Sequence, residues 1–270
     1  SLRGDRTAVF AGEELSIELF VCNDTHTVSD GHTLVLELMD STGNVVMGGE
    51  YDAKFGENSS FMQGDVCFTA PDVTARESYT LRAILTDGTG KVLHYTDESV
   101  EIFPHMAEEP GTAVSVSGEA FLARQEELTS VAASGKTIVI NGLEPGTYDI
   151  AGTEVKVKAC GMRALHFVSR KTGHPLVEGF TPYDFRLWYD TEKDRITPLL
   201  RRTFTADGMT PILTSGNSLT ASAWGQKLYP AFACAEMKCG NGKIILNEVD
   251  LDSHLANPVA RIFKNRLMRY

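Results

Sequence analysis

The sequence TGHPLVEGFTPYDFRLWYD occupies residues 172–190 and combines aromatic side chains with polar and charged ones. It contains Pro175 and Pro182, which prevent a regular helix or strand from running through it. Aromatic bodies with polar tips in such a segment are typical of a loop held in a defined position. We therefore expect the rest of the chain to supply the sheet and helices that hold residues 172–190 in place.

Length, composition and charge limit the possible functions. A chain of 270 residues is long enough for two domains, each with its own core. With 42% hydrophobic and 23% charged residues, the composition is that of a globular protein. The net charge of −11, carried by acidic residues throughout the chain, argues against a nucleic-acid partner. A neutral or cationic partner is expected instead.

No apolar run approaches the length of about 20 residues that a membrane-spanning helix needs, so no membrane partner is expected. The first residues also lack the apolar centre of a signal peptide. The chain begins without Met, which suggests that it is a piece of a longer polypeptide. Five cysteines without a regular spacing favour a reducing, cytoplasmic location. Cys234 and Cys239 are predicted to be buried structural thiols, because no second pair or nearby His completes a zinc site. We expect no metal and no cofactor.

Residues 1–104 carry the pattern of an all-β domain. Apolar and polar residues alternate over residues 15–21 and 33–39, and the turn sequence DGTG at residues 87–90 separates two further strand-like runs. About seven short strands without a helical pattern indicate an immunoglobulin-like β-sandwich, although the Cys…Trp…Cys spacing of antibody domains is absent. Residues 105–112, with a proline and a glycine, are predicted to be a short linker.

Residues 113–270 change to a mixed pattern. Apolar residues at helical spacing predict a helix over residues 119–134, and a continuous apolar strand follows at residues 136–140. Hairpins are predicted over residues 148–158 and 231–247, the latter with the turn sequence GNG. An amphipathic helix is expected from Pro258 to residue 268. These elements predict an α/β domain.

Four stretches then carry a family resemblance: HPLVEGF at residues 174–180, DFRLWYD at 184–190, GKIIL at 242–246 and NPVAR at 257–261. Together they resemble the C-terminal region of bacterial family 2 glycoside hydrolases related to β-galactosidases. The resemblance covers nearly the whole chain. It implies an immunoglobulin-like domain at 1–104, followed at 113–270 by a flavodoxin-like α/β domain similar to class I glutamine amidotransferases.

The resemblance also implies a role. In the members that the chain resembles, a sugar-binding sandwich and a TIM-barrel catalytic domain precede these two domains. A retaining glycosidase holds two carboxylates about 5 Å apart at the ends of barrel strands. No barrel fits into this sequence, so no catalytic residue is carried over. The leading hypothesis is a non-catalytic module that braces the upstream catalytic domain of the same polypeptide or mediates contacts in a homo-oligomer.

Two alternatives remain open. One is a freestanding protein that binds glycans. The other is a small amide or ester hydrolase that uses Cys160, or Ser169 with His166 or His174. Active amidotransferases place their nucleophile in a Gly-x-Cys-x-Gly turn, whereas Cys160 follows Ala159, and Ser169 lacks the glycines of a nucleophile elbow.

Within residues 172–190 the candidate substrate-binding or interface residues are His174, Asp184, Arg186, Trp188 and Tyr189. Aromatic rings stack on sugar faces or fill a partner's pocket, and the charged groups supply directional hydrogen bonds. The same pattern also fits the domain's own core with a local ion pair. The sequence therefore leaves three interpretations: core, sugar site or interface.

Overall fold

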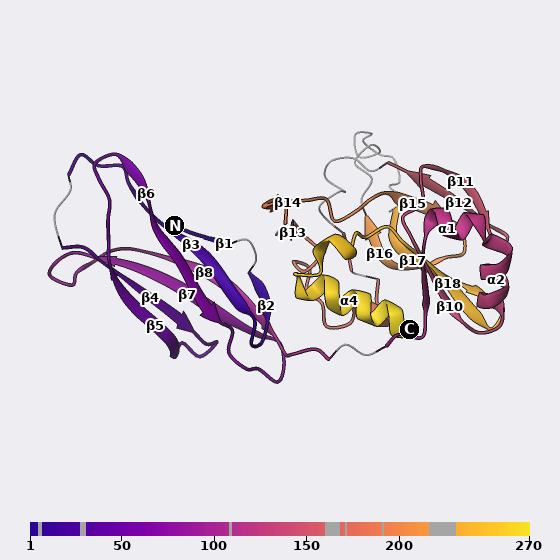
Figure 1. Cartoon of the computed structure of the whole chain (residues 1–270), viewed down its shortest axis with the longest axis horizontal. Helices are drawn as coiled ribbons and strands as arrows, with labels where there is room; N and C mark the ends of the chain where they lie inside the picture. Colours follow the sequence, from indigo (N-terminus) through magenta and orange to yellow (C-terminus); the bar gives the residue numbers. More distant parts are fainter. Residues whose placement is uncertain are drawn as a thin grey trace. The chain divides into compact units, whose positions relative to one another are not determined.

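The computed structural model divides into two compact units, residues 1–107 and residues 108–270 (Figure 1). It describes residues 1–4, 7–27, 31–107, 110–159, 168–170, 172–190, 192–215 and 231–270. The predicted linker at residues 105–112 lies across the division between the units. Cys160 and His166 lie outside the described residues.

Unit 1 consists of strands that pair in two sheets (Figure 1). The strands are β1 (Leu2–Gly4), β2 (Ala8–Phe10), β3 (Glu14–Asn23), β4 (Thr33–Met39), β5 (Val45–Asp52), β6 (Ser59–Thr69), β7 (Glu77–Thr86) and β8 (Val92–Phe103). One sheet has the order β1-β3-β6 and the other the order β2-β8-β7-β4-β5. The two sheets form a β-sandwich.

Period-two alternation explains which side of each strand faces the core of unit 1. Leu15, Ile17 and Leu19 of β3 are buried while the residues between them are exposed, and Leu36 and Leu38 of β4 follow the same rule. Because β3 and β4 each bury one face, the inner faces of the two sheets meet there and exclude water. The alternation in the sequence therefore predicts the sandwich correctly.

The start of the chain contributes to both sheets. β1 pairs antiparallel with β3, whereas β2 pairs parallel with β8 of the other sheet. The chain thus crosses from one sheet to the other within its first ten residues. As a result, each of these short strands covers only part of the edge that it joins.

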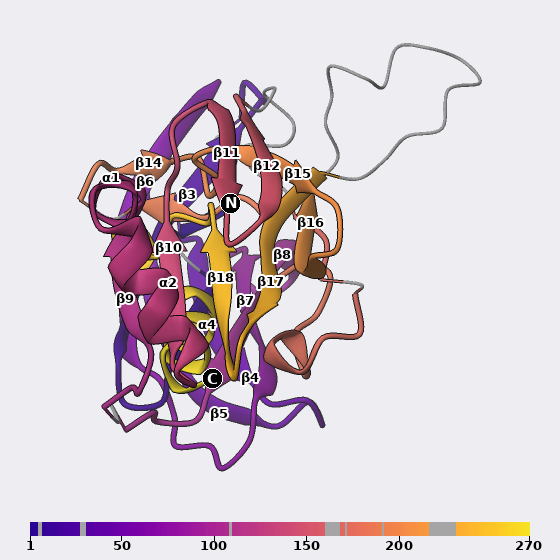
Figure 2. The same cartoon turned by 90° about the vertical axis from the view of Figure 1, so that its right-hand side faces the viewer.

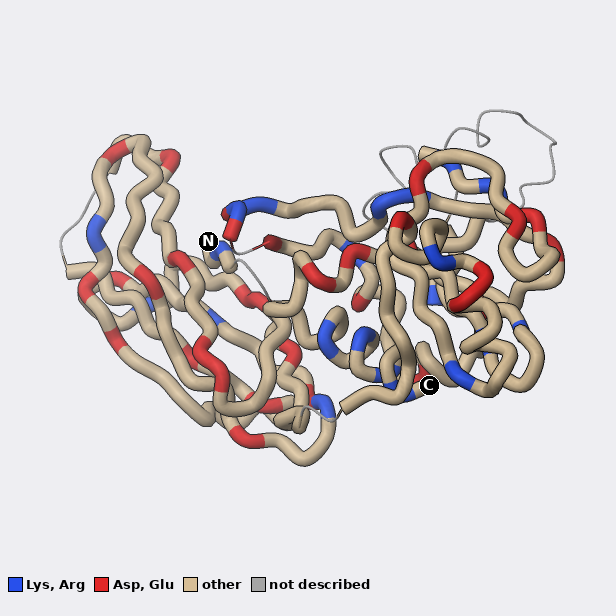
Figure 3. The backbone as a smooth tube through the Cα atoms, turned by 45° about the vertical axis from the view of Figure 1, so that its right-hand side comes forward, with Lys and Arg blue, Asp and Glu red and all other residues tan. Residues whose placement is uncertain are grey.

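Charge is distributed unevenly between the units (Figure 3). Residues 1–107 contain 6 Lys and Arg against 18 Asp and Glu, a net charge of −12, and residues 108–270 contain 19 against 18, a net charge of +1. The acidity of the whole chain is therefore a property of unit 1.

Unit 2 contains one large sheet, a two-stranded ribbon and helices on both faces of the sheet. Its elements are β9 (Val114–Ser117), α1 (Gly118–Ala123), α2 (Gln125–Ala133), β10 (Thr137–Asn141), β11 (Gly146–Ile150), β12 (Thr153–Lys158), η1 (Pro175–Val177), β13 (Tyr189–Asp190), β14 (Arg195–Ile196), β15 (Thr203–Ala206), β16 (Thr210–Ser215), β17 (Ala231–Cys239), β18 (Gly242–Asn247), η2 (Asp252–His254) and α4 (Pro258–Arg269).

The large sheet has the order β11-β12-β15-β17-β18-β10-β9, with β16 also paired to β17. α1 and α2 lie on one side of β10 and β18, and α4 lies on the other (Figure 2). Side chains from α1 and α2 pack with alternate residues of β10 and β18 in one core cluster, to which Phe121, Leu128, Ile138, Ile140 and Ile244 belong. The opposite face of the sheet meets α4, where the helix buries Phe263 and Leu267.

Two details of unit 2 differ from the sequence-based expectation. The predicted helix over residues 119–134 is two helices, because Arg124 leaves the helical conformation with φ −130° and ψ 30°. The sheet is mixed and so departs from the predicted flavodoxin-like arrangement. β9, β10 and β18 run parallel, but β17, β16, β15, β12 and β11 join through antiparallel pairs. Hairpin turns connect neighbouring strands here, whereas a parallel sheet needs crossover helices.

The structure confirms the predicted C-terminal helix and the predicted burial of Cys234 and Cys239. α4 begins after Asn257, whose side chain accepts a hydrogen bond from the Val259 amide, and Pro258 occupies its first turn. Cys234 and Cys239 are buried. No helix among the described residues has the length and apolar character required to span a lipid bilayer.

Candidate functional site

The aromatic residues of 172–190 face the interior of unit 2. Phe180, Phe185 and Trp188 are buried, and Trp188 is only 1% exposed. The ring of Phe185 lies 5.2 Å from that of Phe180 and 5.5 Å from that of Phe263 on α4, both in edge-to-face geometry. The indole N–H of Trp188 donates to the Asp184 carbonyl oxygen at 2.7 Å. These rings are therefore core residues, and Trp188 has no face available for a sugar.

His174 belongs to a second group of contacts. Its Nδ1 accepts a hydrogen bond from the Leu176 amide at 3.2 Å and so caps η1. Since Nδ1 accepts, the proton of the neutral ring lies on Nε2. Nε2 is 3.4 Å from Oε1 of Glu236 on β17 and 3.5 Å from the hydroxyl of Tyr270. His174 thus fastens the start of the segment to the sheet and to the end of α4.

The remaining candidate residues lie apart from His174. Asp184 is buried and accepts a hydrogen bond from the Thr181 amide at 2.6 Å, which closes a local turn. Tyr189 is half-buried, and its hydroxyl bonds to Asp194. Arg186 is exposed, and its guanidinium lies 5.1 Å from the ring centre of Tyr183. These contacts of Asp184, Arg186 and Tyr189 are therefore local, within residues 181–194.

Part of the segment remains exposed. Tyr183 is 73% exposed and Leu187 is 46% exposed. Leu187 also has a φ of +50°, a left-handed conformation that a branched side chain rarely adopts. We call Tyr183, Arg186 and Leu187 the tip. The tip is an apolar and cationic surface. We call the buried rings of Phe180, Phe185 and Trp188 the base of the segment.

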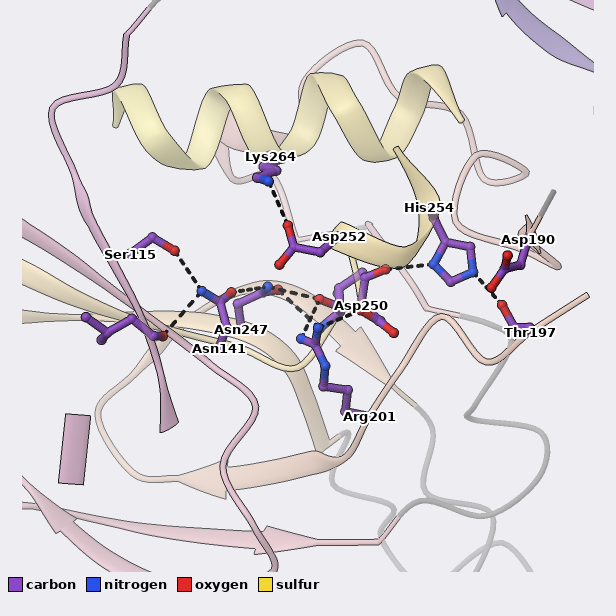
Figure 4. Close-up of polar contacts among 12 residues, drawn as sticks. Ser115, Asn141, Asp190, Thr197, Arg201, Asn247, Asp250, Asp252, His254 and Lys264 are labelled. Atoms are coloured by element: carbon purple, nitrogen blue, oxygen red, sulfur yellow. Dashed lines mark hydrogen bonds and ion pairs between the residues drawn. The ribbon is translucent and has the colours of Figure 1, made fainter. Parts of the chain in front are cut away.

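A polar network that the sequence analysis did not identify lies where the parallel strands end (Figure 4). Asn141 and Asn247 are the last residues of β10 and β18, and Asn247 Nδ2 donates to Asn141 Oδ1 at 2.9 Å. Asn141 Nδ2 donates in turn to the Ser115 hydroxyl at 2.9 Å, and Asn247 Nδ2 also donates to the Val249 carbonyl at 3.0 Å. We call this group the strand-end network.

The strand-end network continues into the loops that follow the sheet. The guanidinium of Arg201 forms an ion pair with Asp250 at 2.5 Å. The ring of His254 contacts the Asp250 carbonyl oxygen through Nδ1 at 2.7 Å and the Thr197 hydroxyl through Nε2 at 2.8 Å. His254 also packs against Trp188, with ring centres 5.3 Å apart. The network therefore connects the strand ends to the core of the 172–190 segment.

The carboxyl ends of parallel strands are the usual ligand site in open α/β sheets. Here the cavity next to them measures only about 20 Å³ and is lined by Asn141, Arg201, Asp252, Lys264 and neighbouring apolar residues. Lys264 bonds to Asp252 at 2.6 Å, so the charged groups at this edge satisfy one another. The described residues thus fill this part of the edge with their own side chains.

Glu248, directly after β18, is a buried carboxyl next to this edge and is 1% exposed. Its Oε1 accepts a hydrogen bond from the Leu143 amide at 2.8 Å, whereas its buried Oε2 makes no hydrogen bond with any described residue. Burial raises the pKa of Glu248 to about 7, and the amide of Leu143 and the charges of Arg201 and Arg202 only partly oppose this effect. Glu248 is therefore a buried group that titrates near neutral pH.

Of the four residues named for hydrolysis, Ser169 and His174 are among the described residues. Cys160 and His166 lie outside the described residues. Ser169 is exposed and forms an isolated bridge with Thr214 through both backbone groups, at 2.7 and 2.9 Å. The Nε2 atom of His174 is directed at Glu236 and Tyr270. In the part of the chain that the structure covers, no three His, Cys, Asp or Glu side chains are arranged to hold a metal ion.

One sequence signal points to the strand-end network. Asn141 and Asn247 each directly follow a continuous apolar strand, IVI at residues 138–140 and IIL at residues 244–246. Polar residues after buried strands of a parallel pair meet at one sheet edge. Only the fold shows that the two strands are neighbours, since Asn141 and Asn247 lie 106 residues apart in the sequence.

No protein-family model and no curated protein matches the sequence. Solved structures match parts of it. A family 2 β-glucuronidase has 12% identity over 47% of this chain and 16% of its own, with a TM-score of 0.30. A cold-adapted β-galactosidase from Rahnella sp. R3 has 15% identity over 58% and 22%, with a TM-score of 0.33. An endonuclease/exonuclease/phosphatase from Beutenbergia cavernae DSM 12333 has 15% identity over 32% and 20%, with a TM-score of 0.23.

The aligned regions therefore span about a fifth of the length of each of these proteins. The similarity is partial and is shared by enzymes of different kinds. A functional assignment accordingly rests on the residues and contacts of this chain.

Proposed function

We propose that the chain is a non-catalytic C-terminal module of a family 2 glycoside hydrolase that braces the upstream catalytic domain through the tip of unit 2. The sequence resemblance of residues 174–180, 184–190, 242–246 and 257–261 supports the family. The strand order of unit 1, in which β1 joins β3 and β2 joins β8, supports its assignment as an immunoglobulin-like domain. Such a sandwich is suited to spacing and supporting its neighbours.

The observation that carries the proposal is the division of residues 172–190 into a buried base and an exposed tip. Phe180, Phe185 and Trp188 fix the base in the core. Leu187 is held at φ +50° with nearly half of its surface exposed. Backbone strain of this kind persists only where the surrounding structure enforces it, and it gathers at functional surfaces. Tyrosine and arginine, two of the three residue types of the tip, are also among those that contribute most to binding when a partner covers them.

The mutual pairing of the described strand-end groups supports a structural role for them. The amides of Asn141 and Asn247 and the charges of Arg201 and Asp250 are engaged with one another. A catalytic edge needs a nucleophile or base that is accessible to a substrate. The strand-end network instead stabilises the loops that hold the base of the 172–190 segment.

The test uses this chain and the polypeptide encoded upstream of Ser1, produced as a separate protein. We expect the upstream protein to contain a catalytic barrel and to bind this chain in calorimetric titration. Changing Tyr183 and Leu187 together to Ser should weaken binding at least tenfold, because it removes two apolar contacts. The matched control is Leu122→Ser, which changes an exposed leucine on α1. An upstream region without a glycosidase, or equal binding by the tip variant, would contradict the proposal.

Freestanding glycan binding is the second candidate, and the exposure of Tyr183 is the observation that favours it. A sugar ring can stack on an exposed tyrosine, whereas the buried Trp188 offers no such face. Glycan-array binding by the chain alone, lost in Tyr183→Ala, would support this candidate over bracing. Turnover of an amide or ester by the chain alone, sensitive to a thiol or serine reagent, would support neither of them.

A further inference from the structure

β5 is the last strand of the five-stranded sheet of unit 1, and its outer edge is open (Figure 1). One edge of β5 pairs with β4, and within the described part of unit 1 no strand pairs with the other edge. Seven of its eight residues are exposed. Natural sheets often protect such an edge with lysine or proline, and the sequence VVMGGEYD of β5 contains neither. The edge is therefore available to another strand.

The pairing of β4 with β5 determines which backbone groups face the open edge. The Ala53 amide donates to the His32 carbonyl oxygen at 2.9 Å, so Ala53 and every second residue before it direct their N–H and C=O groups towards β4. Gly48, Glu50 and Asp52 therefore direct theirs outward. The register of this stretch is regular, because its one shift lies at the start of β5.

Apolar side chains on the core-facing side of β5 are only partly covered. Met47 and Tyr51 lie opposite Leu38 and Leu34 of β4, so these four side chains point to the same side of the sheet. The two leucines are buried, whereas Met47 is 42% exposed and Tyr51 is 56% exposed. A strand added to β5 would extend the core-facing side and cover Met47 and Tyr51.

The sequence of β5 is complementary to a second copy of itself. In an antiparallel pair about a two-fold axis at Gly49, Met47 of each copy lies opposite Tyr51 of the other copy. This contact brings a thioether against an aromatic ring. Gly48 of each copy then lies opposite Glu50 of the other. Because both residues direct their backbone groups outward, they would exchange both hydrogen bonds of an antiparallel pair.

Charge favours this register over other symmetric ones. An axis at Glu50 would place the two Glu50 carboxylates opposite each other, and an axis at Tyr51 would place Glu50 opposite Asp52. Like charges directly opposite each other destabilise a strand pair. An axis at Gly48 keeps the carboxylates apart, but it would use the irregular start of β5 for its second pair. With the axis at Gly49, acidic residues avoid one another and apolar residues meet.

We propose that two copies of this chain form a two-fold dimer through antiparallel pairing of their β5 strands about Gly49. A glycine suits this position, because a Cβ there would come 3.0 Å from the Tyr51 hydroxyl oxygen. The absent side chain thus leaves room for the tyrosine ring beside the partner strand. The proposal uses residues of unit 1 alone, so it goes beyond the proposed function and does not depend on the tip.

Sedimentation equilibrium of the whole chain tests the proposal. We expect a monomer–dimer equilibrium with a Kd on the order of 10–100 µM, as suits a small interface. Each unit 1 has a net charge of −12, so a rise in salt from about 50 mM to about 500 mM should tighten the dimer by screening repulsion between the copies. A chain that stays monomeric up to about 1 mM at either salt concentration would overturn the proposal.

A proline variant tests the backbone pairing. Glu50→Pro removes an outward N–H group and leaves the hydrogen bonds to β4 in place. It should raise the Kd of the dimer at least about tenfold, because both copies lose a hydrogen bond. The matched control is Glu50→Gln, which keeps the N–H and removes a negative charge, so its dimer should be as tight as the original or tighter. An unchanged Kd in Glu50→Pro would contradict the pairing.

A second pair of variants covers the case in which the proline variant does not fold. Tyr51→Lys places a charge opposite Met47 and should weaken the dimer at least about tenfold. Tyr95→Lys makes the same change of charge at a similarly exposed tyrosine on β8 and should leave the Kd unchanged. Equal weakening by both would overturn the proposal. The variant with Ser at Tyr183 and Leu187 should dimerise as the original chain does, and loss of its dimer would place the contact at the tip instead.

Discussion

The side-chain amide of Asn247 donates to Oδ1 of Asn141 at 2.9 Å and so joins the last residues of two adjacent parallel strands. Asn247 also bonds both backbone groups of Val249, at 3.0 and 3.2 Å. We therefore predict that Asn247→Ala lowers the free energy of unfolding by about 2–4 kcal/mol, because it leaves buried partners without hydrogen bonds. Urea denaturation measures the change. Asn241→Ala, at an exposed asparagine in the β17–β18 turn, should change it by less than about 0.5 kcal/mol.

Glu248 should make stability depend on pH. Its pKa in the folded protein is about 7, against an ordinary value of 4.5, so the folded state binds the proton more tightly than the unfolded chain does. The stability that it contributes is fully present below pH 4.5 and is lost as the pH rises through about 7. The difference between the two pKa values corresponds to about 3 kcal/mol in the free energy of unfolding.

Glu248→Gln, which keeps an oxygen for the Leu143 amide, should remove most of this dependence. The gain in stability of the variant relative to the original chain should therefore grow between about pH 4.5 and pH 7 and stay constant at higher pH. Denaturant titrations at several pH values measure it. Glu126→Gln, at an exposed carboxyl on α2, is the control, and a similar pH profile for both variants would contradict the assignment.

Replacement of Trp188 tests whether this residue belongs to the core or to a binding surface. Trp188→Ala should cost about 3–5 kcal/mol of folding free energy, because it removes a fully buried ring. Trp188→Phe keeps an aromatic ring but loses the hydrogen bond to the Asp184 carbonyl, so a smaller loss of about 1–3 kcal/mol is expected. Tyr183→Ala, at an exposed ring, should change stability by less than about 0.5 kcal/mol. Chemical denaturation measures these changes. Equal losses of unfolding free energy in Trp188→Ala and Tyr183→Ala would show that Trp188 is not part of the core.

Leu187→Gly should stabilise unit 2. A left-handed conformation costs an ordinary residue about 1–2 kcal/mol, and glycine adopts it without that strain, although glycine also gains freedom in the unfolded chain. The expected net gain is about 0.5–1 kcal/mol in the free energy of unfolding. Leu122→Gly, at an exposed leucine inside α1, should lose about 1 kcal/mol instead. A loss at both positions would mean that the backbone at Leu187 is not strained.

Some elements of this fold could be predicted from local sequence, because their cause is local. The alternation of Leu15, Ile17 and Leu19 specifies which face of β3 is buried. The side chain of Asn257 and the ring of Pro258 specify where α4 begins. Each depends on residues within a few positions of one another, so no tertiary information is needed.

Other features could not be predicted in this way. The turn sequences predicted the hairpins β11–β12 and β17–β18 correctly, but they did not predict that β18 pairs in parallel with β10 or that β12 pairs with β15. The choice of neighbours depends on which surfaces meet after the chain has turned back on itself. Local periodicity gives no information on that choice.

The candidate site shows the same limit. The sequence by itself determined that residues 172–190 are a positioned aromatic segment, because prolines exclude regular structure and the rings need burial or a partner. Only the tertiary structure decided that Trp188 faces the core and Leu187 faces outward, since that depends on α4 and the sheet lying against one side of the segment. The Asn141–Asn247 bond is likewise a tertiary fact, because only folding brings together two strand ends that are 106 residues apart.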